Sequence, residues 1–97
     1  MATPDDLQLL IEAEDEVFDY PIISASAKEF LNDPRHHLAI AVANDQMVGM
    51  ASAFHYIHPD KNTELFINEV GVMDELQNRG IGTRLMEFLV DFGKGIG

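Results

Sequence analysis

The 97-residue sequence contains no cysteine, few basic residues and no long hydrophobic run. Without cysteine, the chain can form neither a disulfide nor a thiolate metal site, and it has no cysteine nucleophile. The redox compartment therefore stays open, and we take the cytoplasm as the default. No apolar stretch reaches the roughly 18 residues that a membrane-spanning helix needs. Asp5 and Asp6 stand where a secretory signal peptide carries lysine or arginine, so we expect no signal peptide.

Basic residues are scarce, since 6 lysines and arginines face 17 acidic residues, for a formal net charge of -11. Residues 1–33 hold nine acids and one lysine, a balance of -8, and the rest of the chain carries the remaining -3. A negative field repels nucleic acid and anionic membranes and concentrates cations, including polyamine-like substrates. We therefore expect no nucleic-acid or membrane partner and a cationic small molecule as ligand. On charge alone, however, a solvated, solubilising face is the preferred explanation of the acidic segment.

The composition indicates one folded domain over residues 1–97. Its apolar fraction of 46% is too high for a disordered chain, and its length leaves no room for a second core. The N-terminal third predicts two helices. The first starts at Thr3-Pro4 with a cap and a first-turn proline, and its apolar positions continue through Phe18. The second starts at Ser26, with Glu29 in capping-box spacing, and stops before Asp33-Pro34.

Beyond residue 36 the apolar period changes from that of a helix to that of a strand. Residues 37–57 predict a β-hairpin that turns at Asn44-Asp45, and residues 63–73 predict a third strand. On simple alternation, Leu65, Ile67 and Glu69 share one face of that strand. A last helix follows, with an apolar stripe formed by Leu85, Phe88, Leu89 and Phe92. The fold class is α/β (α+β) with a mainly antiparallel sheet, because short loops join the strands.

Two glycines stand two residues apart in "QNRGIG", residues 77–82, between the third strand and the last helix. Glycine is a poor helix residue, so its presence indicates a sharp turn or a close approach to another group. A strand, a glycine loop and a helix start together form an anion site, because unpaired amides and the helix dipole point at the same place. Arg79 and Arg84 add positive charge. The loop is neither a Walker loop nor the dinucleotide fingerprint, and taken alone it could be a plain strand-to-helix turn.

In context, this segment resembles the pyrophosphate-binding signature [QR]-x-x-G-x-[GA] of the GNAT superfamily of acetyl-CoA-dependent N-acetyltransferases. The signature positions all match, and the order of elements before them is similar to that family. Within it, "FINEVGVMDELQNRGIGTRLM" looks closest to aminoglycoside 3-N-acetyltransferases of the fortimicin and gentamicin type. The resemblance implies a partial GNAT fold and an enzyme that moves an acetyl group from acetyl-CoA to a primary amine, with an aminoglycoside antibiotic as one candidate.

The resemblance also implies site residues. Backbone groups of Val70 and Val72 would bind the pantetheine arm as an added strand, and the loop amides would hold the pyrophosphate. The implied cofactor-binding residues are Val70, Gly71, Val72, Gln77, Asn78, Arg79, Gly80, Ile81, Gly82 and Thr83. Glu69 matches an acidic strand residue placed at the substrate amine, where a carboxylate could accept the amine's proton. Without the resemblance, Glu69 is equally well explained as an ion-paired or solvated residue.

The histidines and the large apolar residues of the strands do not predict a further functional site. His36, His37, His55 and His58 form no recognised ligand motif, so we predict no metal site. Met47, Met50, Phe54 and Tyr56 are interpreted as core or groove-lining residues.

The sequence departs from the family at its end, since the family continues with further strands and a helix after the glycine-loop helix. We therefore expect a C-terminally incomplete domain with no assignable general acid. Its residues 63–73 would form an exposed sheet edge, the final apolar stripe would lie partly bare, and a homodimer would cover both. Two functions stay open: an acetyltransferase, or a catalytically silent fragment that self-associates and at most binds CoA.

Overall fold

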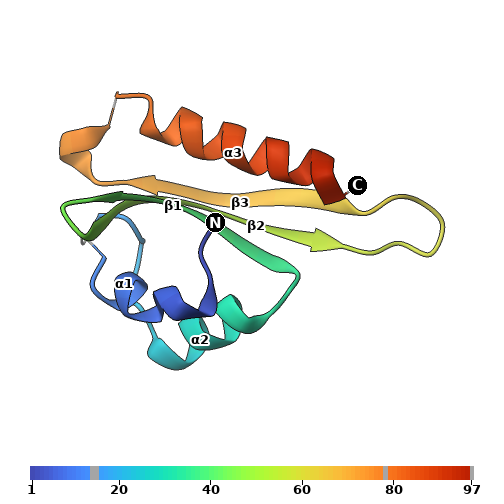
Figure 1. The fold of residues 1–97 in the computed structure, drawn as a ribbon, viewed down its shortest axis with the longest axis horizontal. Coiled ribbons are helices and arrows are strands. Elements are labelled where there is room, and N and C mark those ends of the chain that lie inside the picture. Colours follow the sequence, from blue (N-terminus) through green and yellow to red (C-terminus); the bar gives the residue numbers. More distant parts are fainter. Residues whose placement is uncertain (14–15, 78, 97) are drawn as a thin grey trace.

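The computed structural model describes residues 1–13, 16–77 and 79–96. Its elements run in the order η1 (Pro4–Asp6), α1 (Leu7–Ile11), α2 (Ser24–Asn32), β1 (His36–Ala43), β2 (Gln46–Tyr56), β3 (Glu64–Val72), η2 (Asp74–Leu76) and α3 (Ile81–Ile96). Figure 1 shows three layers, with α1 and α2 on one side of the sheet and α3 on the other.

The sheet has three strands in the order β1-β2-β3, and both neighbouring pairs are antiparallel. The predicted α+β fold with an antiparallel sheet is therefore confirmed. Asn44 and Asp45 join β1 to β2 with φ angles of 53° and 63°. Asparagine and aspartate tolerate this left-handed region, which two-residue hairpin turns require. Since β3 is at one end of the strand order, the predicted exposed edge is also present in the part of the chain that the structure describes.

A β-bulge in β3 changes which residues share a face. Ser52 pairs with Glu69 and Ala53 pairs with Ile67, so Asn68 is an extra residue between two ladder positions. An extra residue shifts the alternation by one. Leu65 and Ile67 therefore pack on the α3 side, whereas Glu69 faces α1 and α2. The prediction that Leu65, Ile67 and Glu69 share one face was wrong for this reason.

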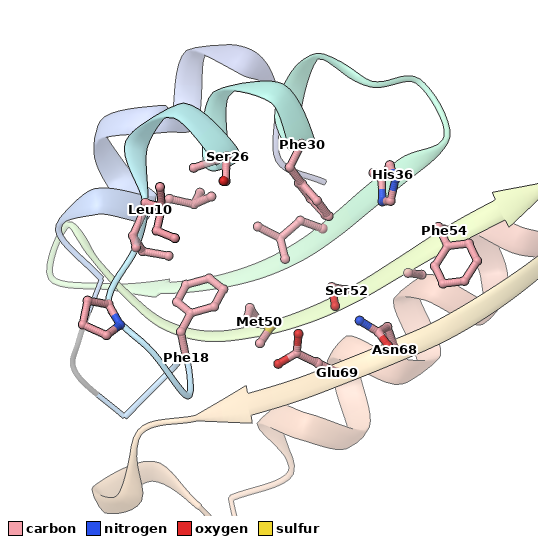
Figure 2. Close-up of a pocket in the computed structure, with 16 residues that line it drawn as sticks. Leu10, Phe18, Ser26, Phe30, His36, Met50, Ser52, Phe54, Asn68 and Glu69 are labelled. Carbon is pink, nitrogen blue, oxygen red and sulfur yellow. The ribbon is translucent and has the colours of Figure 1, made fainter.

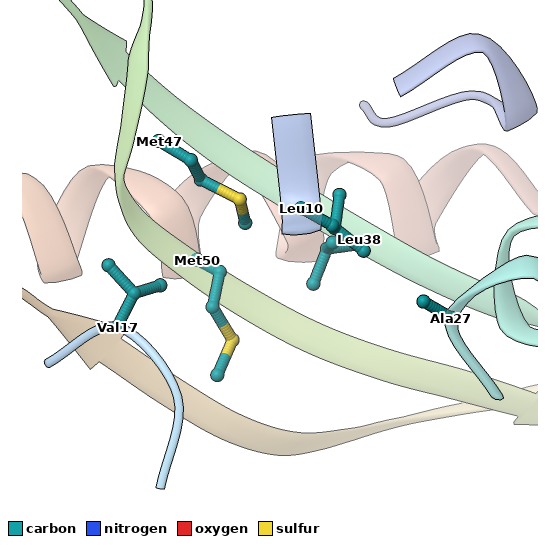
Figure 3. Packing of buried hydrophobic residues seen from close by; sticks show 6 residues of the cluster. All are labelled: Leu10, Val17, Ala27, Leu38, Met47 and Met50. Atoms are coloured by element: carbon teal, nitrogen blue, oxygen red, sulfur yellow. The ribbon is translucent and has the colours of Figure 1, made fainter. Parts of the chain in front are cut away.

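The N-terminal helix is shorter than predicted. Thr3 caps it as expected, in a reciprocal capping box with Asp6, but α1 ends at Ile11. Two observations account for the early stop. Glu12 and Glu16 carry like charges at helical i, i+4 spacing, which disfavours continuation. The chain also has to bring Val17 across the sheet, where that side chain is only 1% exposed in the core cluster of Figure 3.

The start of the second helix also differs from the prediction. It begins at Ser24, its N-cap residue is Ile23, and no side chain caps it. The predicted capping box of Ser26 with Glu29 was wrong, because Ser26 lies inside the helix. Packing of Ala27 and Phe30 on the core fixes this helix instead of a polar cap. Its end at Asn32, before Asp33-Pro34, is as predicted.

The α3 face of the sheet presents small residues from β1 and β2 and larger ones, among them Leu65 and Ile67, from β3. Ala39, Ala51 and Ala53 form a buried cluster with Leu85 and Leu89 of α3. These two leucines are 6% and 0% exposed, so the part of the predicted stripe that they form is covered by the sheet. Phe88, from the same predicted stripe, is 49% exposed. Small side chains on the sheet let the helix approach closely, which places the start of α3 directly over the end of β3.

Candidate active site at the end of strand β3

Hydrogen bonds from both sides hold the connection between β3 and α3. The Met73 amide donates to the Val48 carbonyl at 3.0 Å, which ties the connection to the neighbouring strand. The Gln77 side-chain amide donates to the Val72 carbonyl and to Asp74 Oδ1, both at 3.1 Å. Gln77, the first signature position, therefore braces the loop through its side chain. Asn78, which the sequence also assigned to the cofactor, lies outside the described residues.

Gly80 forms the start of the last helix. Its φ of +78° lies in the left-handed region, and an added Cβ would meet nothing within 4 Å. Glycine is therefore required here by backbone conformation, not by crowding. The Gly80 carbonyl accepts the Arg84 amide at 3.0 Å, the first bond of the α3 ladder. Helix geometry consequently leaves the amides of Ile81, Gly82 and Thr83 without intrahelical acceptors.

The free amides lie over the end of the edge strand. A Cβ on Gly82 would lie 3.7 Å from Val70 Cγ1 and 3.9 Å from Val72 Cγ2, so this turn of α3 rests on those two side chains. Arg79 and Arg84 are exposed next to it. Amides at a helix start, the helix dipole and two guanidinium groups suit a pyrophosphate. The residues that the structure describes thus fit the phosphate end of acetyl-CoA.

Gly71 has a packing role beside the one implied for it. A Cβ there would lie 2.0 Å from the carbonyl oxygen of Val17, so the Val17 backbone crosses β3 at this glycine. The preceding residue, Glu16, contacts Asp74: its pKa is raised above the usual value, first by a side-chain hydrogen bond with Asp74 and then by desolvation and the Asp74 charge. Packing of Val17 against β3 therefore anchors the segment after α1, whereas the carboxyl groups of Glu16 and Asp74 repel each other unless they share a proton.

A cavity of about 430 Å³ lies between the sheet and the two N-terminal helices. Figure 2 shows Glu69 at this cavity, with its carboxylate turned toward the interior. Ser52, which is 8% exposed, stands opposite Glu69 in the strand register and also lines the cavity. Directly opposite residues have Cβ atoms about 5 Å apart, so a small ligand can reach both side chains. Glu69 is exposed at this position, and only the bulge at Asn68 turns it to this side.

The rings of Phe30, His36 and Phe54 form one wall of the cavity, and Phe66, which does not line it, packs on Phe54. Phe30 and His36 have centroids 5.1 Å apart, His36 and Phe54 6.0 Å, and Phe54 and Phe66 5.4 Å. Sequence reasoning missed Ser52, Asn68 and Phe30 as cavity residues. For Ser52 a signal existed, since it is the polar residue between Met50 and Phe54 at alternate positions of one strand. Met47 and Met50 are buried, as predicted for core residues.

Two of the four histidines, His37 and His55, lie against each other. His37 Nε2 and His55 Nδ1 lie 2.7 Å apart, and the ring of Phe92 packs on His37 with centroids 4.6 Å apart. Burial lowers the pKa of His37, and the neighbouring His55 and His36 lower it further. His58 lies 3.6 Å from Glu64. Among residues 1–13, 16–77 and 79–96, no three His, Asp or Glu side chains are grouped to hold a metal ion.

Residues 6–97 match the profile of the Acetyltransferase (GNAT) family. The chain belongs to this family. No curated protein sequence matches it. No helix in the described ranges is long and apolar enough to span a bilayer.

Solved structures of acetyltransferases share this fold. An aminoglycoside acetyltransferase from an uncultured soil metagenomic sample, in complex with sisomicin, is 20% identical with a TM-score of 0.78, over 97% of this chain and 67% of that one. A ribosomal-protein-alanine N-acetyltransferase from Brucella melitensis biovar Abortus 2308 is 14% identical with a TM-score of 0.79, and the match covers 98% of this chain and 70% of that one. A GNAT family acetyltransferase from Staphylococcus aureus is 19% identical with a TM-score of 0.72, and the match covers 94% of this chain and 70% of that one. At these identities the likeness establishes the fold alone.

Proposed function

We propose that this chain carries the acetyl-CoA and amine sites of an N-acetyltransferase that acts on a primary amine. One observation carries the proposal. The edge strand β3 connects the helix start that suits an anion with Glu69, whose carboxylate lines a cavity. The Gly80-capped start of α3 lies over Val70 and Val72, and Glu69, the residue before them, lines the cavity on the other side of the sheet. A substrate amine at Glu69 would thus meet a cofactor arm that follows β3.

The binding roles follow from the backbone. Acetyl-CoA, when bound, supplies an acetyl group activated as a thioester. The amides of Ile81, Gly82 and Thr83 donate hydrogen bonds to its phosphates, and Arg79 adds charge. The outer edge of β3 offers unpaired N–H and C=O groups beside Val70 and Val72, which suit the amides of a pantetheine arm as an added strand.

Glu69 performs the proton chemistry in this proposal. It accepts a proton from the substrate ammonium, directly or through water, so that the nitrogen regains its lone pair. The nitrogen then forms a bond to the carbonyl carbon while the carbon–sulfur bond breaks. The second amine proton ends on the departing sulfur, and Glu69 returns its own proton to solvent. Ser52, opposite Glu69, lies where its hydroxyl can orient the amine.

The acceptor is a cationic primary amine in this proposal, and an aminoglycoside antibiotic is the specific candidate that the sequence resemblance raises. A solved relative with this fold binds sisomicin. The net charge of -11 favours cationic acceptors in general.

The test measures thiol release from acetyl-CoA with a panel of primary amines that includes sisomicin. We expect release with at least one amine, and Glu69→Gln should lower kcat by roughly 100-fold or more, as for loss of a general base. Glu64→Gln, on the same strand but outside the cavity, is the matched control and should retain the rate. A chain that neither binds CoA nor acetylates any amine would overturn the proposal.

A second candidate, a catalytically silent chain that self-associates, is favoured by the β3 edge. Leu65 and Ile67 of β3 line a groove with Val90 and Gly93 of α3 beside that edge. An unpaired edge next to apolar side chains is a template for pairing with a second copy. This candidate predicts a homodimer of about twice 10.8 kDa by light scattering, and a clean monomer mass at micromolar concentration would contradict it.

A further inference from the structure

The cavity beside Glu69 is mainly apolar. Eleven of its sixteen lining residues have apolar side chains. Of the described lining residues, Glu69 alone carries a carboxylate. A volume of about 430 Å³ is at the small end of ligand pockets, which span roughly 300–1,000 Å³. The cavity therefore offers one charged partner and a large apolar surface to a ligand of modest size.

The charged and the aromatic parts of the cavity have a defined separation. Glu69 stands opposite Ser52, and Phe54 is two residues further along the same strand, facing the same side. Two residues of strand span about 7 Å. Phe54 packs between the rings of His36 and Phe66, which holds the aromatic wall in place. A ligand that contacts both Glu69 and Phe54 therefore needs a short linker between its charged group and its apolar body.

We propose that the acceptor is a primary amine with an aromatic or aliphatic body on a short linker, an arylalkylamine being the best fit, and not a polyhydroxylated polyamine. This inference rests on the proposed function, because it assigns the substrate class of the same site. The ammonium group binds at Glu69 and Ser52, and the body fills the cavity against Phe30 and Phe54.

Solvation argues for this class over an aminoglycoside. A sugar-based body would lose hydrogen bonds to water at each hydroxyl and find apolar walls in return. Its additional ammonium groups would find no second carboxylate among the described lining residues. An aromatic body gains from the same walls, through burial of apolar surface and through ring packing on Phe54.

The test measures binding without acetyl-CoA, by NMR titration of the full chain. The probes are 2-phenylethylamine, its neutral analogue 2-phenylethanol, ethanolamine and sisomicin. We expect 2-phenylethylamine to bind at least about tenfold more tightly than ethanolamine and sisomicin. Glu69→Gln should weaken the amine about tenfold and leave the alcohol unchanged. Glu87→Gln, on the exposed side of α3, is the charge control and should change neither affinity.

A cavity-filling variant tests the location. Ser26 lies on α2, is exposed and lines the cavity, so Ser26→Phe should block 2-phenylethylamine without disturbing the core. Ser24→Phe is the matched control on the same helix, since Ser24 is exposed and does not line the cavity. Equal binding by both variants would overturn the assignment of the cavity.

The outcomes separate this inference from the proposed function. If sisomicin or ethanolamine binds more tightly than 2-phenylethylamine, the substrate class is wrong, whether or not acetyl transfer occurs. If 2-phenylethylamine binds in the cavity but no amine is acetylated, the inference about the cavity survives and the proposed reaction fails.

Discussion

The two faces of the sheet are built on opposite principles. Toward α3, β1 and β2 present alanines and glycine, and a Cβ on Gly49 would already lie 3.3 Å from Ile81 and 3.4 Å from Leu85. Toward α1 and α2 it presents large side chains, among them Met50 and Phe54, and a cavity stays open between them. The first face is closely packed at its centre, under Leu85 and Leu89, with grooves at its margins. The second keeps a cavity between the sheet and the helices.

This difference assigns separate tasks to the two layers. Close packing under α3 fixes the helix start over β3, so the amides at Gly80 are preorganised for an anion. The open face holds Glu69 at a cavity that can admit small molecules. Because β3 belongs to both faces, the strand connects the two halves of the proposed site. Changes on the closely packed face should therefore cost stability, and changes on the open face should mainly alter binding.

The largest expected effect is on the closely packed face. Leu89 is 0% exposed among alanines that cannot fill a void, so Leu89→Ala should lower the free energy of unfolding by about 4 kcal/mol. Met50→Ala should cost about 2 kcal/mol, the low end for such a truncation, because it enlarges a cavity that already exists and does not create a new one. Urea unfolding measures both. Val90→Ala, 46% exposed, is the control and should stay within about 0.5 kcal/mol. Equal losses of unfolding free energy for Leu89→Ala and Met50→Ala would contradict the proposed difference in packing between the two faces.

A smaller effect is expected where the two regions meet. Gly71→Ala would place a Cβ 2.0 Å from the Val17 carbonyl, and backbone must move to relieve it. We expect a loss of about 2 kcal/mol in unfolding free energy, typical of overpacking. Gly95→Ala is the matched control, since a Cβ there meets nothing within 4 Å, and it should be neutral or stabilising. Stability unchanged by Gly71→Ala would mean that the Val17 segment is free to lift away.

On the anion site, Gly80→Asp should weaken CoA binding well over tenfold, which corresponds to more than about 1.4 kcal/mol. The new carboxylate would lie where phosphate binds, at a position with φ of +78°. Gly80→Asn separates the causes, because asparagine tolerates this φ and carries no charge. We expect it to bind CoA better than the aspartate variant. If titration calorimetry finds that Gly80→Asp binds CoA with wild-type affinity, CoA does not bind at this loop.

The sequence predicts those elements that local chemistry determines. Asn44-Asp45 dictates a left-handed turn, and Gly80 marks a helix start that needs positive φ, so the hairpin and the glycine loop were found in advance. The bulge at Asn68 was not found, because register depends on how β2 and β3 pair, and neither strand alone encodes it. The same applies to Ser52, whose place at the cavity results from pairing with Glu69. Local signals therefore located the glycine loop, the resemblance to the GNAT family suggested its phosphate role, and tertiary pairing determines the geometry around Glu69.

The smallest expected effect is a pH dependence on the α3 face. Burial first, then the nearby His55 and His36, lower the pKa of His37 from 6.5, while Asp33 opposes the shift. A histidine with a lowered pKa in the folded state binds its proton more weakly than in the unfolded chain. Its contribution to stability is therefore complete above about pH 6.5 and declines as the pH falls through the folded-state pKa.

His37→Phe should flatten this decline, since phenylalanine keeps the packing on Phe92 and cannot bind a proton. The measurement is the midpoint of urea unfolding between about pH 7.5 and 5.5, a range in which carboxylates contribute little. We expect the wild-type midpoint to fall with pH and the variant's midpoint to change less. The contact between His37 Nε2 and His55 Nδ1 at 2.7 Å requires one nitrogen without a proton, so double protonation must break it. If the urea midpoint falls with pH equally in the wild type and in His37→Phe, protonation of His37 does not affect the stability of the protein.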